Sequence, residues 1–154
     1  MKNLLLVLLV CLGMIACGED VEPLKTLQKG APNSVTLSNG EIVYNLDGEW
    51  NCVYQQSMRE EEPEDIIKIS QDGNTFVGIY VNGHVYMNAG SEAIKGELEK
   101  NGFKSVYVNT TSDPHVQSSE GWKPATGKIS ENCDKIITTA KVEGDNVKLT
   151  LNRK

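Results

Sequence analysis

The stretch 146-NVKLTLN-152 alternates apolar and polar side chains with a period of two. It places Val147, Leu149 and Leu151 on one face and polar side chains on the other. Successive side chains of a β-strand point to opposite faces, so this alternation is typical of a strand with one buried face. We therefore expect the segment to be a strand that packs its aliphatic side on a core.

The pattern recurs outward from this stretch. The segment 135-KIITTAKV-142 places its own set on one face (Ile136, Thr138, Ala140 and Val142). Asn-Gly and Asp-Gly pairs, which suit the tight turns of β-hairpins, separate further short alternating runs. These pairs are Asp47-Gly48, Asp72-Gly73, Asn82-Gly83 and Asn101-Gly102, and Gly144-Asp145-Asn146 makes a similar turn.

Residues 41–154 contain about nine or ten candidate strands and no convincing helix. Regular short strands with hairpin turns predict an antiparallel meander. A meander of this size usually closes on itself, because closure removes unpaired strand edges. The prediction is an all-β fold in which residues 41–154 form one small barrel of about eight strands.

One run is apolar on both faces. In 74-NTFVGIYV-81, three aliphatic side chains alternate with Phe76 and Tyr80, and the next predicted strand, 84-HVYMN-88, opposes Val85 and Met87 to Tyr86. A strand of this kind lies between the core and another layer, or it presents a patch to a partner. The simpler interpretation places the tyrosines over the barrel exterior.

The longest interruption between predicted strands is 109-NTTSDPHVQSSEGWKP-124. Loops of this length in compact domains often carry function. Its tryptophan is either a recognition anchor or a cover for an open barrel end. The candidate ligand or partner contacts are the aromatic side chains of these regions: Phe76, Tyr80, Tyr86, Tyr107 and Trp122.

The N-terminus has the pattern of a secretory signal over residues 1–16. Lys2 precedes the uncharged run 4-LLLVLLVCLGMIA-16, which is too short to span a bilayer comfortably. The ending 14-MIAC-17 resembles the lipobox of bacterial lipoproteins. The resemblance implies that the signal is cleaved before Cys17 and that this cysteine carries acyl chains, palmitate among them, that hold the protein on a membrane.

The resemblance also implies a location. Gly18 replaces the aspartate that often retains lipoproteins in the inner membrane. We therefore expect a lipid-anchored protein of the bacterial cell envelope, most simply on the outer membrane, facing the periplasm or the surface. Residues 17–40 lack a sustained period and contain Pro23, Gly30 and Pro32, which predicts a flexible tether between the anchor and the domain.

Charge excludes one class of partner. The formal charge is −6, and loss of Lys2 with the signal leaves 14 basic against 21 acidic side chains, or −7. Nucleic-acid binding needs clustered lysine and arginine, so we expect no nucleic-acid partner.

The cysteines predict a disulfide. With Cys11 removed and Cys17 lipidated, Cys52 and Cys133 remain as a pair in an oxidising compartment. Metal binding is the alternative, but neither cysteine has another cysteine or a histidine at zinc-ligand spacing. We expect a bond between them and no metal site.

The stretch 46-LDGEWNCVY-54 resembles the lipocalin signature, a glycine and a tryptophan at the start of the first barrel strand. In that family the tryptophan closes one end of an eight-stranded barrel, and an arginine after the last strand packs across its indole ring. Carried over, the resemblance implies a structural set of Gly48, Trp50 and Arg153.

No pattern points to catalysis, and we expect neither an enzyme nor a cofactor. His84 and His115 are isolated, and no G-x-S-x-G motif or phosphate-binding glycine loop is present. The acidic cluster 59-REEEPED-65 is interpreted as a solvated loop.

Two functions stay open. The lipocalin resemblance implies that the barrel binds a small apolar ligand. The alternative is a protein-interaction module, such as a hydrolase inhibitor or an accessory subunit of an envelope complex, with the loop around Trp122 as its contact surface.

Overall fold

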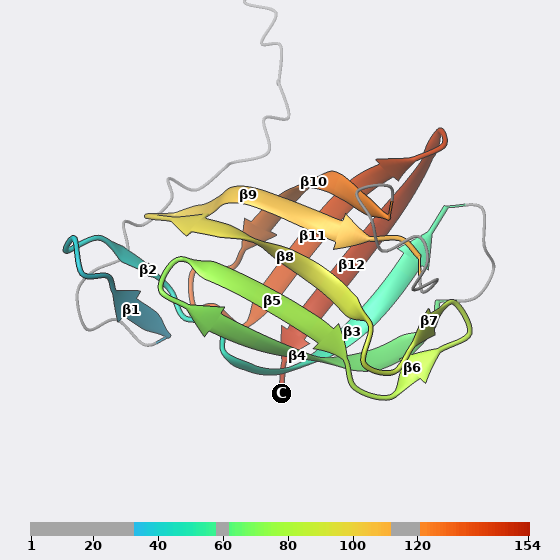
Figure 1. Cartoon of the computed structure of the whole chain (residues 1–154), viewed down its shortest axis with the longest axis horizontal. Helices are drawn as coiled ribbons and strands as arrows, with labels where there is room; N and C mark the ends of the chain where they lie inside the picture. Colours follow the sequence, from blue (N-terminus) through green and yellow to red (C-terminus); the bar gives the residue numbers. More distant parts are fainter. Residues whose placement is uncertain (1–32, 58–61, 112–120) are drawn as a thin grey trace, which may run out of the picture.

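The computed structural model describes residues 33–57, 62–111 and 121–154, which form strands and turns without a helix (Figure 1). Eight strands make a closed barrel. They are β3 (Gly48–Gln56), β4 (Glu64–Asp72), β5 (Thr75–Tyr80), β8 (Glu92–Glu99), β9 (Gly102–Asn109), β10 (Trp122–Ile129), β11 (Lys135–Val142) and β12 (Asp145–Arg153). In this part of the chain no helix is long and apolar enough to cross a membrane.

Each barrel strand pairs antiparallel with the next barrel strand along the chain, and β12 pairs with β3 to close the ring. The prediction of an all-β meander that closes into an eight-stranded barrel is confirmed. The inward faces agree with the alternation of β11 and β12, since Ile136, Thr138, Val147, Leu149 and Leu151 are all buried.

Side chains fill much of the barrel interior. A Cβ atom at Gly78 would lie 2.8 Å from the side chains of both Ile67 and Ile94. A Cβ at Gly127 would lie 2.7 Å from the ring of Phe103. Glycine occurs at these inward positions because isoleucine and phenylalanine from neighbouring strands already occupy the space. The barrel is therefore a packed core over this part of its length.

Two small hairpins lie at opposite ends of the barrel (Figure 1). One consists of β1 (Ser34–Thr36) and β2 (Ile42–Tyr44), and the other of β6 (Gly83–His84) and β7 (Met87–Asn88). The first hairpin leads into β3 along the chain, and the second is inserted between β5 and β8.

The first hairpin corrects the predicted tether. Gln71 of β4 donates a hydrogen bond to the Tyr44 carbonyl at 3.0 Å and accepts one from the Leu46 amide at 2.7 Å. Val43 and Tyr44 are buried, so the hairpin is part of the core. The tether prediction is wrong for residues 33–40, because a paired strand in this segment packs on the barrel; residues 17–32 lie outside the described part.

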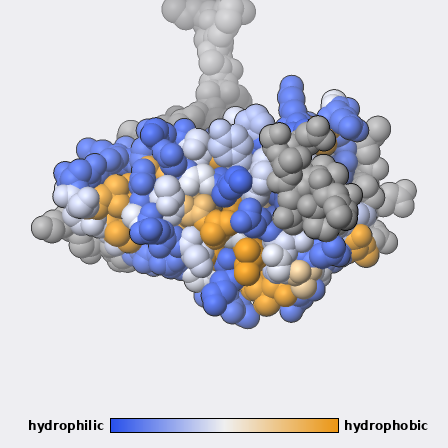
Figure 2. Space-filling view, viewed as in Figure 1, coloured by the Kyte–Doolittle hydropathy of each residue, from blue (hydrophilic) through white to orange (hydrophobic). Residues whose placement is uncertain are grey.

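The second hairpin corrects the strand predicted at 84–88. The chain turns at Val85 and Tyr86 instead of running straight, which leaves Val85 73% exposed and Met87 buried. The placement of tyrosines on the exterior is wrong for Tyr80, which points inward and is fully buried. The outward face of β5 is aliphatic, with Ile79 37% exposed, and Figure 2 shows apolar atoms over β5 and β8 on this side.

Candidate functional site

One end of the barrel is closed by Trp50 and Arg153. The indole is fully buried and its Nε1–H donates to the Leu46 carbonyl at 2.9 Å. The Arg153 guanidinium carbon lies 4.3 Å from the centre of the indole ring. The same guanidinium donates to the carbonyls of Asn45 (2.6 Å), Asp47 (3.0 Å) and Cys133 (2.8 Å). This is the geometry that the lipocalin resemblance implies, and its role is structural.

Gly48 belongs to the same closed end. Its φ is +124°, a backbone conformation that side chains other than hydrogen rarely allow. Arg153 Nη1 lies 3.8 Å from the position of an added Cβ. Glycine therefore lets the chain turn into β3 beneath the arginine.

The opposite end contains a group of rings that we call the mouth cluster: Tyr54, Tyr80, His84 and Tyr86. The histidine is at its centre, with ring centroids 5.4 Å from Tyr54, 5.1 Å from Tyr80 and 5.8 Å from Tyr86. Tyr54 and Tyr80 come from the last parts of β3 and β5, whereas His84 and Tyr86 come from the β6–β7 hairpin. The hairpin thus inserts its histidine between barrel tyrosines.

Two buried polar atoms of the mouth cluster have no hydrogen-bond partner among the described residues: the Tyr80 hydroxyl and His84 Nε2. His84 Nδ1 accepts a bond from the Tyr86 amide at 3.2 Å, which leaves the ring proton of the neutral imidazole on Nε2. Both orphaned atoms can therefore donate. Buried polar groups are nearly always paired, so each orphan needs an explanation.

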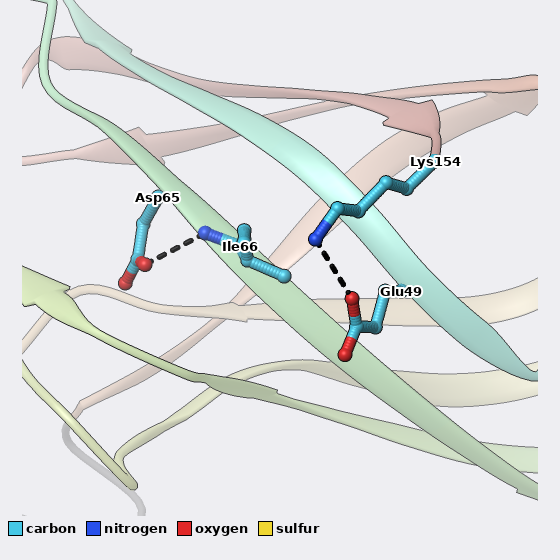
Figure 3. A network of polar contacts seen from close by, with 4 residues as sticks. All are labelled: Glu49, Asp65, Ile66 and Lys154. Atoms are coloured by element: carbon cyan, nitrogen blue, oxygen red, sulfur yellow. Dashed lines mark hydrogen bonds and ion pairs between the residues drawn. The ribbon is translucent and has the colours of Figure 1, made fainter.

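Asp65 fixes the hairpin in place. Its carboxylate accepts hydrogen bonds from the amides of Ile66 (2.6 Å, Figure 3), Asn82 (3.1 Å) and Gly83 (2.6 Å). The side chain is buried, and it lies in β4 on the same face as Ile67. The interpretation of 59–65 as a solvated loop is therefore wrong for Asp65, because this carboxylate binds the chain that enters the β6–β7 hairpin; residues 59–61 lie outside the described part.

Burial favours the uncharged forms of Tyr80 and His84. It raises the pKa of Tyr80 well above the ordinary value, and the nearby Cys52, Tyr54 and Asp65 raise this pKa further. Burial also lowers the pKa of His84 below 6.5, and the negative charge of Asp65 opposes this shift in part. The cluster therefore offers neutral hydrogen-bond donors rather than an acid–base pair with a charge at pH 7.

The predicted disulfide is wrong, because Cys52 and Cys133 are both free and buried. Cys133 is at the closed end, where its sulfur lies 3.2 Å from Arg153 Nη2 and 3.4 Å from the Asn45 carbonyl oxygen. Cys52 faces inward two residues further along β3 than Trp50, and burial raises its pKa strongly. The two thiols are thus on either side of the Trp50 position. The described residues hold no group of three or more metal-ligating side chains.

The five predicted contact residues do not form one site. Tyr80 and Tyr86 join the mouth cluster, whereas Phe76 packs in the interior on Phe103, with ring centroids 5.6 Å apart. Tyr107 is on the outer face and is 39% exposed. Trp122 is the first residue of β10 rather than part of a loop, and its ring centre lies 3.9 Å from Lys95 Nζ.

Tyr54, His84 and Asp65 were missed as site residues. A signal existed for two of them, since Tyr54 shares the inward parity of Trp50, and Asp65 shares that of Ile67. Comparison with models of known protein families gives no match, and comparison with curated proteins gives no significant relative. Cys17 lies outside the described residues.

Proposed function

We propose that the protein is a lipid-anchored binding protein of the bacterial cell envelope whose barrel takes a small, largely apolar ligand at the mouth cluster. An eight-stranded closed barrel fits the lipocalin-like fold in general. The observation that carries the proposal is the pair of buried, unpartnered polar atoms in the mouth cluster, Tyr80 Oη and His84 Nε2. Binding sites typically combine aromatic walls with a few such polar groups.

The packing of the barrel supports this end as the binding place. The Trp50–Arg153 pair closes the other end, and side chains fill the interior around Gly78 and Gly127. A ligand in the mouth would contact Tyr54 and Tyr86, whose ring centroids are 5.9 Å apart.

The anchor rests on the lipobox at Cys17. Acylation at this residue would hold the barrel at a membrane, since each buried methylene contributes about 0.8 kcal/mol. Replacing Cys17 with serine in the full chain should move the protein from the membrane fraction to the periplasmic or secreted fraction. Unchanged recovery in washed membranes would contradict the lipoprotein proposal.

The ligand proposal is tested by native mass spectrometry on residues 18–154 after export to a periplasm, since this chain keeps every described residue. We expect a reproducible added mass that is lost on denaturation. The variant Tyr80→Ala should lose this mass, whereas Tyr107→Ala on the outer face should keep it. A bare wild-type chain would contradict the proposal and favour the alternative, a protein-interaction module with Tyr107 and Trp122 in its contact face.

A further inference from the structure

We infer that the mouth cluster selects a ligand with an uncharged hydrogen-bond acceptor on an aromatic ring, such as the carbonyl of an amide or ester, and discriminates against the matching carboxylate. This inference rests on the proposed ligand binding and adds the chemical class of the ligand. It follows from the two orphaned donors and from the fixed charge beside them.

The two unpartnered donors indicate that the ligand carries a hydrogen-bond acceptor. The Tyr80 hydroxyl is fully buried, and the rings of Tyr80 and His84 meet edge to face with centroids 5.1 Å apart. Both Oη–H and Nε2–H lack an acceptor among the described residues. A carbonyl oxygen has two lone pairs, so a single ligand oxygen is able to accept hydrogen bonds from two donors. An acceptor placed here would therefore satisfy two buried groups that are otherwise unpaired.

The negative charge of Asp65 disfavours an anionic ligand. Both of its oxygens act only as acceptors, toward the amides of Ile66, Asn82 and Gly83, which is the role of an ionised carboxylate. Its negative charge acts on both Tyr80 and His84. A second carboxylate next to these groups would be repelled in a poorly hydrated site, where screening is weak.

The orphaned groups also bear on a cationic head group. Three backbone amides donate to the Asp65 oxygens, and His84 Nε2 carries a proton rather than a lone pair. The charge of Asp65 attracts a cation, but a cation leaves the two orphaned donors without an acceptor. The donors therefore favour a ligand that brings an acceptor, and Asp65 favours a neutral acceptor over an anionic one.

The probes are benzamide and benzoate, which share a ring and a planar head group but differ in charge at pH 7. Both are titrated into residues 18–154 and followed by NMR shifts of the backbone amides and of the His84 ring protons. We expect saturable shifts with benzamide in the β6–β7 hairpin, and binding of benzoate at least about tenfold weaker, which corresponds to about 1.4 kcal/mol.

Variants separate the two parts of the inference. Asp65→Asn keeps an acceptor oxygen but removes the charge. It should therefore reduce the difference in affinity between benzamide and benzoate. Tyr80→Phe removes one donor and should weaken benzamide binding several-fold, whereas Tyr107→Phe on the outer face should leave it unchanged. Benzoate that binds as tightly as benzamide would overturn the charge selection alone. Failure of both probes to bind would overturn the proposed mouth site, and this inference with it.

Discussion

Arg153 and Trp50 occupy paired positions of β12 and β3, and the guanidinium carbon lies 4.3 Å from the centre of the indole ring. The last barrel strand, β12, is thereby joined to the first, β3, near the point where the chain enters the barrel. The arginine also binds the carbonyls of Asn45 and Asp47 in the segment that precedes β3. One side chain thus links the entry of the barrel to its final strand.

Replacing Arg153 with alanine should lower the free energy of unfolding by about 3 kcal/mol, because it removes the cation–π contact and leaves the partly buried carbonyls of Asn45 and Cys133 unpaired. Chemical denaturation measures this loss. The matched control is Lys154→Ala, which removes only the exposed ion pair with Glu49 (3.0 Å, Figure 3) and should cost less than about 1 kcal/mol. Equal losses in the two variants would contradict a special role for Arg153.

The free thiols make a prediction that a disulfide cannot satisfy. In residues 18–154 the native protein should react slowly with a thiol reagent at pH 8, because burial raises the pKa of Cys52 and of Cys133 and hides both sulfurs. Unfolding without a reductant should expose two reactive thiols. Finding none in the unfolded chain would show that the two cysteines are bonded.

The sequence predicts the barrel well because alternation is a local signal. The inward faces of β11 and β12 follow directly from the period of two, as at Leu149 and Leu151. The mouth cluster was only partly predictable, since it depends on which residues a hairpin folds over the end. Val85 and Tyr86 fit a strand pattern, yet the chain turns there, where Gly83 has a positive φ and the amides of Asn82 and Gly83 donate to Asp65.

The disulfide prediction failed for a related reason. An even number of cysteines does not show that two of them are close enough to bond, and Cys52 and Cys133 lie at different levels of the barrel. Cys133 has a positive φ of 55° in the turn before β11, and its carbonyl accepts a bond from Arg153. This arrangement follows from the closure of the barrel end and cannot be seen in spacing.

Packing around the glycines predicts sharp sensitivity to one added carbon. A Cβ at Gly96 would lie 2.1 Å from the Ser105 carbonyl oxygen, which is backbone and cannot move aside easily. Gly96→Ala should therefore destabilise the barrel by about 2–3 kcal/mol in thermal or chemical unfolding. Gly102→Ala is the control, because nothing lies within 4 Å of its added carbon. Similar stability of both variants would contradict the close approach of β8 and β9.

Protonation of His84 should weaken the fold. Its pKa in the folded protein is below 6.5 because burial disfavours the charged ring, so the unfolded chain binds more protons between pH 6.5 and that lower value. Stability should fall as the pH drops through this window and then level off. His84→Asn keeps an acceptor for the Tyr86 amide without titrating in this range, so its stability should lack this component of the pH dependence. Parallel pH profiles for the two proteins would contradict the shift.

The orphaned hydroxyl predicts an unusual stability effect. Tyr80→Phe removes a buried group that has no partner among the described residues, so it should leave the free energy of unfolding unchanged or raise it by up to about 1 kcal/mol. Trp50→Phe is the contrast, because it loses a hydrogen bond to the Leu46 carbonyl as well as volume and should destabilise clearly.

The stability of Tyr80→Phe also bears on function, because the Tyr80 hydroxyl is proposed to donate a hydrogen bond to the ligand. A protein that retains an unpaired group in its mouth cluster gives up a little stability for binding. If Tyr80→Phe instead costs more than about 1 kcal/mol, the hydroxyl already has a partner in the unliganded protein. It would then be unavailable as a donor to a carbonyl, and the neutral-acceptor selectivity would have to rest on His84 alone.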